Sequence, residues 1–158
     1  MSVLEFCRWV QYSPPLIAMR DSPCLFPVIA TIHLMGRTLI GGAVLIVDLR
    51  LLGLGLHRQP VAQLAHDAER WLLSGLLVMV STGILLFMCF ATKYYYLTFF
   101  WVKMASLLLV IVFTLSVRRR VAMANEGDVS PVRCKLVALV SLSLWTIVAT
   151  GGRWIGFP

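Results

Sequence analysis

The hydrophobic pattern divides the chain into four long apolar runs that are separated by short polar connections. Each run is about 20 residues or longer, which is enough for an α-helix to cross the hydrocarbon core of a bilayer. Pro60 and Pro131 stand at the starts of two runs, a position where a helix tolerates proline. The pattern therefore predicts an all-α integral membrane four-helix bundle that forms a single domain over residues 1–158. The expected spans cover residues 26–53, 60–91, 98–118 and 131–154.

A short amphipathic segment precedes the first run. Residues 2–12 mix apolar and aromatic side chains with polar ones, and Ser2 and Glu5 have the spacing of a capping box. A helix of this length is too short to span a bilayer, so we expect a short interfacial helix. Ser13-Pro14-Pro15 is expected to end it, and a connector containing further prolines follows.

Composition supports a membrane protein and narrows its partners. Hydrophobic residues make up 59% of the chain and charged residues 13%, about half the usual share of a soluble domain. The net charge is +7, but aromatic residues are not interleaved with the basic ones in the way that stacks bases, so we expect no nucleic acid partner. The expected partners are the lipid bilayer, a membrane or periplasmic redox protein, and a second copy of the chain.

The basic residues predict the orientation of the spans. Lys93 is the single basic residue of the second connection, where it precedes three tyrosines that form an aromatic belt. The first and third connections are richer in basic residues, and such connections stay in the cytoplasm. Both termini are then periplasmic, in a bacterial inner membrane. The basic residues used are Arg50, Arg58, Arg118, Arg119, Arg120, Arg133 and Lys135.

The first span carries its polar residues on one face. On a helical wheel His33, Arg37, Gly41, Val44 and Asp48 fall within an arc of about 80°. A charge that faces lipid costs several kcal/mol, so this stripe must face protein, water or a cofactor. The glycine leaves room beside the stripe for a flat ring system or another helix.

Basic groups from three spans converge in the predicted outer half of the membrane. His33 and Arg37 from the first span, Lys103 from the third and Arg153 from the fourth lie at similar depth, without an acidic residue among them. Such a cluster needs an anion or water. Haem b supplies an anion and an iron: His33 would be the metal ligand, and Arg37, Lys103 and Arg153 would hold the propionates. Gly36 and Gly41 would leave room beside His33 for the macrocycle.

Other roles for these residues stay open. His33 would in that case be a structural residue that hydrogen-bonds a neighbouring helix. Arg153 would be an anchor at the membrane interface. Met79 and Met104 are alternatives for a second axial ligand. At the inner ends of the first two helices, ion pairs among Asp48, Arg50, Asp67 and Arg70 are expected to fix the hairpin.

Four sequence motifs resemble those of a bacterial family of small four-helix membrane proteins to which no activity is assigned. They are His33-Leu-Met-Gly36, Asp48-Leu-Arg-Leu-Leu-Gly53, Thr82-Gly83 and Phe100-Trp-Val-Lys103.

More distantly, His33, Gly36, Arg50 with Leu51, and Trp101 beside Lys103 resemble HemJ-type protoporphyrinogen oxidases. That resemblance implies haem b. The Tyr-His pair that follows the arginine in those enzymes is missing here. The resemblance therefore implies haem binding more strongly than it implies oxidase activity.

Two main hypotheses follow from the sequence. The first is a membrane haem b-binding redox protein that transfers electrons, with its site in the periplasmic half of the bundle. The alternative is a non-redox membrane subunit that docks a partner or binds lipid, and an oxidase of porphyrinogens is a third hypothesis. The sequence does not decide whether the chain is an enzyme.

Overall fold

The structure is a computed structural model that describes residues 2–55, 60–124 and 129–154, without the side chains of the last two. Arg58, one of the basic residues used to predict the orientation, lies outside the described residues. Within the described ranges the chain is helical apart from short connections.

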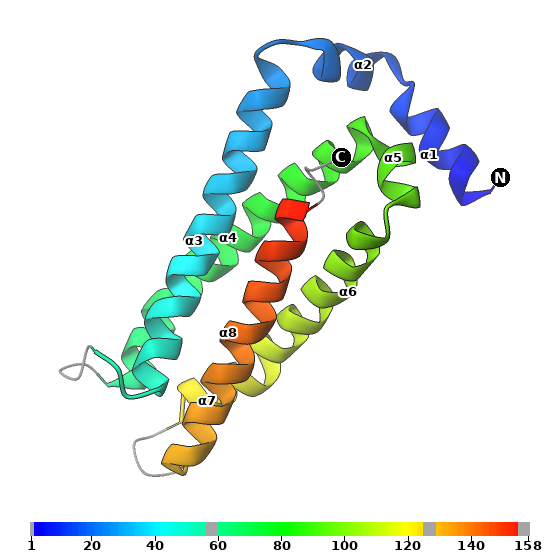
Figure 1. Cartoon of the computed structure of the whole chain (residues 1–158). Helices are drawn as coiled ribbons and strands as arrows, with labels where there is room; N and C mark the ends of the chain where they lie inside the picture. The colour runs from blue at the N-terminus through cyan, green and yellow to red at the C-terminus, as the bar shows by residue number, and fades with distance from the viewer. Residues whose placement is uncertain (1, 56–59, 125–128, 155–158) are drawn as a thin grey trace.

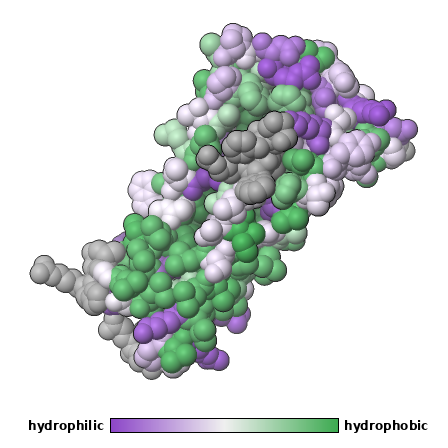
Figure 2. All heavy atoms as spheres, in the orientation of Figure 1, coloured by the Kyte–Doolittle hydropathy of each residue, from purple (hydrophilic) through white to green (hydrophobic). Residues whose placement is uncertain are grey.

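Four helical segments of the described part are long and apolar enough to cross a membrane. Helices α3 (Leu25–Leu51), α4 (Val61–Cys89) and α8 (Pro131–Trp154) form three of them, and α6 (Thr98–Phe113) begins the fourth, which continues to Ala122. They run side by side as a bundle (Figure 1). Apolar side chains cover most of the visible surface of these helices, and polar ones gather toward the two ends (Figure 2). The predicted all-α membrane bundle is confirmed.

Two short helices precede the bundle where the sequence predicted one. Helix α1 (Val3–Gln11) has the predicted capping box, with Glu5 N donating to Ser2 Oγ at 3.2 Å and Ser2 N donating to Glu5 Oε2 at 2.8 Å. The predicted connector after it is wrong, because Pro14–Asp21 forms helix α2. The first positions of a helix need no N–H donor, so Pro14 and Pro15 begin a helix here.

The N-terminal helices are fastened to one end of the bundle. Gln11 is buried, and its side-chain oxygen accepts hydrogen bonds from Thr92 N at 2.9 Å and from Thr92 Oγ1 at 2.6 Å. Thr92 belongs to the short helix α5 (Ala91–Tyr96), which lies between α4 and α6 in the chain. We call this the α5 end of the bundle; α1, α2 and the last turn of α8 lie there as well (Figure 1).

Helices α3 and α4 approach each other closely at a pair of glycines. A Cβ added to Gly36 would lie 3.2 Å from Gly75 O, and one added to Gly75 would lie 3.1 Å from Gly36 O. The backbones therefore touch, as small residues allow in membrane helices. The adjoining core contains Ile40, Val44 and Leu72. This contact sets the register of α3 against α4.

The third span does not end at its arginines as predicted. It continues through a π-helical turn, η1 (Thr114–Arg118), into α7 (Arg119–Ala122), at the opposite end of the bundle from α5; we call this the α7 end. Because Arg118 is buried, it is not an interfacial residue: its Nε donates to Asp48 Oδ1 at 2.7 Å.

The predicted ion pairing of Asp48 within the first hairpin is therefore wrong. Its partner Arg118 comes from the third span, so the ion pair ties α3 to η1. Arg119 pairs with Glu69 of α4 at 2.7 Å, and exposed His66 and Asp67 approach each other at 3.8 Å on α4 itself.

Candidate functional site

Three of the predicted site residues line one cavity near the α5 end of the bundle. His33 and Arg37 come from α3 and Lys103 from α6, and Gly83 of α4 and Gly152 of α8 lie in the same lining. The cavity has a volume of about 260 Å³, close to the range of small-molecule sites. The structure thus brings His33, Arg37 and Lys103 together, although Arg37 and Lys103 lie far apart in the sequence.

A hydrogen bond orients the imidazole of His33. Its Nδ1 lies 3.0 Å from Thr82 Oγ1, and that hydroxyl also donates to Val78 O, one turn earlier on α4. A hydroxyl has a single proton, so Thr82 accepts from the imidazole and Nδ1 carries the hydrogen. This assignment leaves the lone pair on Nε2, where a ligand or metal binds a neutral imidazole.

Gly83 gives the imidazole its place against α4. A Cβ added there would lie 3.2 Å from His33 Cε1, closer than ordinary van der Waals contact. The Thr-Gly pair therefore supplies both a hydrogen-bond acceptor and a close packing surface for one ring. The sequence pointed to this pair only through the family resemblance.

Two consecutive glycines of α8 admit the cationic side chains. Arg37 Nη2 donates to Ala149 O at 2.9 Å, and a Cβ added to Gly152 would lie 3.3 Å from Arg37 Nη1. A Cβ added to Gly151 would lie 3.7 Å from Lys103 Cβ. Helix α8 thus packs on Arg37 and Lys103 through residues without side chains.

Among the described residues that line it, the cavity has positively charged side chains and no carboxylate. Arg37 and Lys103 repel each other, and both are partly buried within the membrane-spanning part of the bundle. In such surroundings a pair of cations is stabilised by an anion or by water. The arrangement therefore suits a ligand with one or more acidic groups.

A second cavity adjoins the first and is almost entirely apolar. It lies between α4 and α6 and has a volume of about 370 Å³. Exposed Ile84 and Trp101 stand on its walls, so it opens toward the side of the bundle that faces lipid. The residues that line both cavities are His33, Gly83, Phe87, Phe100 and Lys103. The imidazole and the ammonium group therefore stand where an apolar slot meets a charged cavity.

A stack of three aromatic rings forms part of the wall. Phe87, Tyr94 and Phe100 are mutually stacked, with ring centroids 5.1 to 6.3 Å apart and planes within 20° of parallel. Tyr94 belongs to α5, outside the membrane spans, and burial raises the pKa of its hydroxyl. The hydroxyl is therefore protonated at neutral pH and is able to donate a hydrogen bond.

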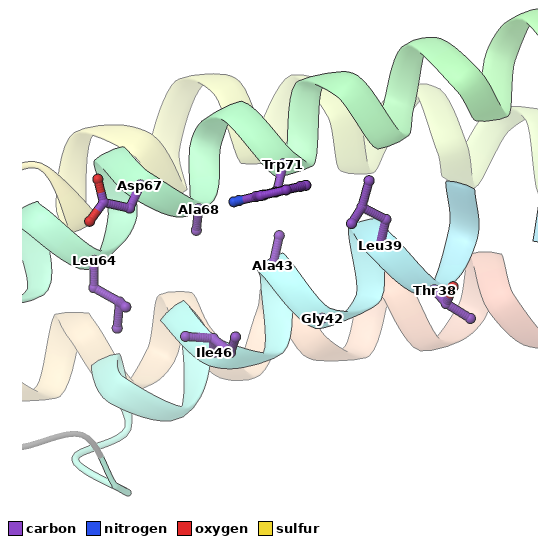
Figure 3. A pocket seen from close by; sticks show the side chains of 9 residues that line it. All are labelled: Thr38, Leu39, Gly42, Ala43, Ile46, Leu64, Asp67, Ala68 and Trp71. Atoms are coloured by element: carbon purple, nitrogen blue, oxygen red, sulfur yellow. The ribbon is translucent and has the colours of Figure 1, made fainter. Parts of the chain in front are cut away.

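Gly41 and Arg153 are not placed with the other predicted site residues. Gly41 lies on an open face of α3, where an added Cβ would meet nothing within 4 Å, and it lines neither cavity. Its neighbour Gly42 lines a separate hollow on the outer face of α3 and α4, beneath Trp71 (Figure 3). Arg153 lies in the last turn of α8, but its side chain is outside the described part of the chain.

The site supplies one imidazole, which is fewer ligands than a bare metal ion needs. Among the described residues no group of three His, Cys, Asp or Glu side chains is placed to hold a metal, whereas a protein-bound zinc ion takes three or four ligands. Haem iron needs one or two protein ligands. Met79 and Met104 line the apolar slot together with His33.

Several residues of the site were not found from the sequence. From the sequence, Phe87 belongs to a span interior, Tyr94 to the interfacial belt and Gly152 to a helix end. The periodicity of one helix does not show which residues of another helix it contacts. The signal that existed was local: an uncommon Gly-Gly pair beside a basic residue at the end of an apolar run.

Comparison with known proteins identifies a family. Among curated proteins and among solved structures nothing matches, so the resemblance to HemJ-type oxidases stays a prediction. The model of a family of unknown function, DUF6644, matches residues 25–158. The match begins at α3 and includes all four spans with both cavities. The chain therefore belongs to the DUF6644 family.

Proposed function

We propose that this protein is a membrane haem b-binding redox protein that transfers electrons. The observation that carries the proposal is the position of His33. Its imidazole is oriented by Thr82 and stands where an apolar slot meets a cavity that contains Arg37 and Lys103.

The residues present fit the three chemical parts of haem b. The apolar slot between α4 and α6 suits the flat macrocycle, and the lone pair on His33 Nε2 suits the iron. Arg37 and Lys103 suit the two propionates, since charge-assisted hydrogen bonds to carboxylates are the strong ones. When bound, haem supplies one-electron redox chemistry.

The chain's own residues would then orient and tune the group. Thr82 would accept the hydrogen bond from Nδ1, which fixes the tautomer of the neutral imidazole and the direction of Nε2. The positive charges of Arg37 and Lys103 would favour the reduced form of the haem over the oxidised form, because the low dielectric of the interior strengthens their electric field. Met79 and Met104, which line the same slot, would be the candidates for a second iron ligand.

The proposal includes a location. The exposed basic residues Arg119, Arg120 and Arg133 lie toward the α7 end, and this supports a cytoplasmic position for that end. The α5 end with the site would then lie in the periplasmic half of a bacterial inner membrane. A membrane or periplasmic redox protein would exchange electrons with it there, and a second copy of the chain is a further partner.

An absorption spectrum tests the proposal. The protein is overproduced in cells that are supplied with the haem precursor 5-aminolaevulinate and is purified in a mild detergent. The expected result is a Soret band that shifts when dithionite is added. A purified, folded protein without a Soret band, which also takes up no added haemin, would refute the proposal.

A second function is favoured by one observation. The slot opens toward lipid, and its inner end carries two cations, so a lipid with an acidic headgroup also fits. In that case the chain would be a non-redox membrane subunit. Native mass spectrometry of the same preparation separates the two, because a retained anionic phospholipid and a retained haem differ in mass.

A further inference from the structure

A cavity at the α7 end lies where all four membrane spans end. Leu51 is the last residue of the first span, Val61 begins the second, Val121 lies at the end of the third and Pro131 begins the fourth. All four residues line this cavity, which has a volume of about 260 Å³. The ends of membrane spans lie at the depth of the lipid headgroups, so the cavity opens at that depth.

Two basic side chains stand in the wall of the cavity. Arg50 lies in the last turn of α3 and is partly buried, and Lys135 lies in the second turn of α8 and is exposed. The described residues of the lining include no carboxylate. Arg50 also takes part in another interaction of the chain, but a guanidinium has five N–H donors and is able to serve a ligand as well. The side chains of the cavity therefore favour a negatively charged ligand.

The helix ends around the cavity favour an anion too. Helix α8 begins at Pro131 in the lining, and the N-terminus of a helix is the positive end of its dipole. The C-terminal carbonyls of α3 already accept hydrogen bonds from the turn that follows it. Leu54 N donates to Leu49 O at 2.8 Å. Gly53 N donates to Arg50 O at 3.0 Å, and the turn gives Gly53 a φ of 82°, which glycine adopts without strain.

Lys135 stands at the border between the cavity and the outer face of α8. On a helical wheel Leu139 and Val132 lie about 40° and 60° from it on one side, and Ala138 lies about 60° from it on the other. Val132 is 67% and Leu139 53% exposed, whereas Ala138 is completely buried. A ligand held by Lys135 therefore has the cavity on one side and an apolar, lipid-facing surface on the other. This arrangement suits an amphiphile with an acidic headgroup.

The apolar part of the cavity distinguishes a lipid from a free ion. Leu51, Val61 and Val121 offer apolar surface, from which inorganic phosphate gains nothing but the glycerol backbone of a phospholipid gains burial. Basic pockets between membrane helices are typical sites for acidic lipid headgroups. We propose that this cavity binds the phosphate-bearing headgroup of an acidic phospholipid through Arg50 and Lys135, with the acyl chains along the outer face of α8.

The proposed lipid site is separate from the haem site. Its described lining shares no residue with either cavity near His33. The proposal therefore does not rest on haem binding, and it differs from an acidic lipid in the slot beside Lys103.

Lipid binding in detergent tests the proposal. Purified protein in an uncharged detergent at physiological ionic strength is titrated with phosphatidylglycerol or phosphatidylcholine, and bound lipid is counted by native mass spectrometry. Phosphatidylglycerol should bind more tightly. Lys135→Gln should weaken its binding about tenfold, because a charge-assisted hydrogen bond is lost. Arg133→Gln is the matched control, since Arg133 is exposed about 160° around α8 from Lys135, and it should change the affinity by less than about twofold.

The same titration gives the results that would overturn the proposal. They are equal affinities for the two lipids, or equal effects of Lys135→Gln and Arg133→Gln. Lys103→Gln tests the other location: a phosphatidylglycerol that is lost in Lys103→Gln and retained in Lys135→Gln would lie in the slot near His33, which would also contradict the proposal.

The thiol of Cys134 gives a second measurement on the otherwise unchanged cavity. Cys134 is partly buried in the lining, Cys7 and Cys89 are buried, and Cys24 is exposed and is removed by Cys24→Ser. Phosphatidylglycerol should slow the alkylation of Cys134 by a maleimide, and inorganic phosphate should not. Equal protection by inorganic phosphate would identify an ion site, and no protection by phosphatidylglycerol would place the lipid elsewhere; either result would overturn the proposal.

Discussion

The contact between α3 and α4 predicts opposite effects of one substitution at two glycines. In Gly75→Ala the new methyl carbon would lie 2.9 Å from Ile40 Cγ1, 3.1 Å from Gly36 O and 3.3 Å from Ile40 N. The side chain of Ile40 is able to rotate, but the two backbone atoms are not. Helix α3 must therefore move away from α4 by a few tenths of an ångström. In Gly42→Ala the new methyl meets nothing within 4 Å.

The magnitude follows from comparing the two variants. Both gain about 1 kcal/mol of helix propensity, since alanine replaces glycine inside a helix. Gly75→Ala alone is overpacked, at a cost of about 1–3 kcal/mol. The propensity gain cancels in the difference, so Gly75→Ala should be less stable than Gly42→Ala by about 1–3 kcal/mol.

Reversible unfolding in mixed detergent micelles with increasing dodecyl sulfate measures this difference through the loss of helical circular dichroism. The loss of stability should be accompanied by weaker haem retention, because Thr82 lies two turns beyond Gly75 on the helix that orients His33. A Gly75→Ala protein as stable as Gly42→Ala would show that the two helices do not touch at this point.

Three further predictions follow. Asp48→Asn leaves the charge of Arg118 buried without a counter-charge, so it should lower the free energy of unfolding by about 3–5 kcal/mol in the same assay. The control Arg70→Gln, at an exposed site, should change this free energy by less than about 0.5 kcal/mol. Equal effects of the two variants would contradict the buried pair, and loss of the Soret band in Asp48→Asn would place Asp48 in the haem site. Thr82→Val removes the acceptor of the imidazole hydrogen, and the expected result is about 10–100-fold weaker haem binding in a haemin titration, with unchanged affinity as the contradictory outcome. Alkaline phosphatase fused after Pro158 should be active, whereas an inactive phosphatase together with a bright fluorescent-protein fusion would contradict the periplasmic C-terminus.

The long helices were predictable because their signal is local. Runs of apolar residues, bounded by Pro60 and Pro131, identify the spans without reference to any other part of the chain. Helix α2 was missed because a Pro-Pro pair is compatible both with the end of one helix and with the first turn of the next. The extension of the third span was missed because arginines usually mark a membrane interface. The residues around Arg118 in the sequence do not show that it is buried in an ion pair with Asp48.

The candidate site was predictable only where one helix determines it. His33 and Arg37 share a face of α3, so the helical period placed them together, and Lys103 was added from its depth in the membrane. The roles of Thr82 and Gly152 depend on how α4 and α8 are rotated about their own axes. That rotation is set by contacts between distant segments, such as Gly36 with Gly75. The same limit explains why Gly41 was wrongly expected beside the site. The helical period puts it on the polar stripe of α3, but the packing of the helices leaves it on an open face.

The haem content of two histidine variants tests the central claim most directly. His33→Ala and His66→Ala are purified from cells supplied with the haem precursor, and haem per protein is measured as the pyridine haemochrome. His66 is exposed near the start of α4, toward the α7 end, so its loss should leave the wild-type content unchanged. His33→Ala should lose the haem and its Soret band. A full haem complement in His33→Ala, with loss of haem in His66→Ala, would contradict the account.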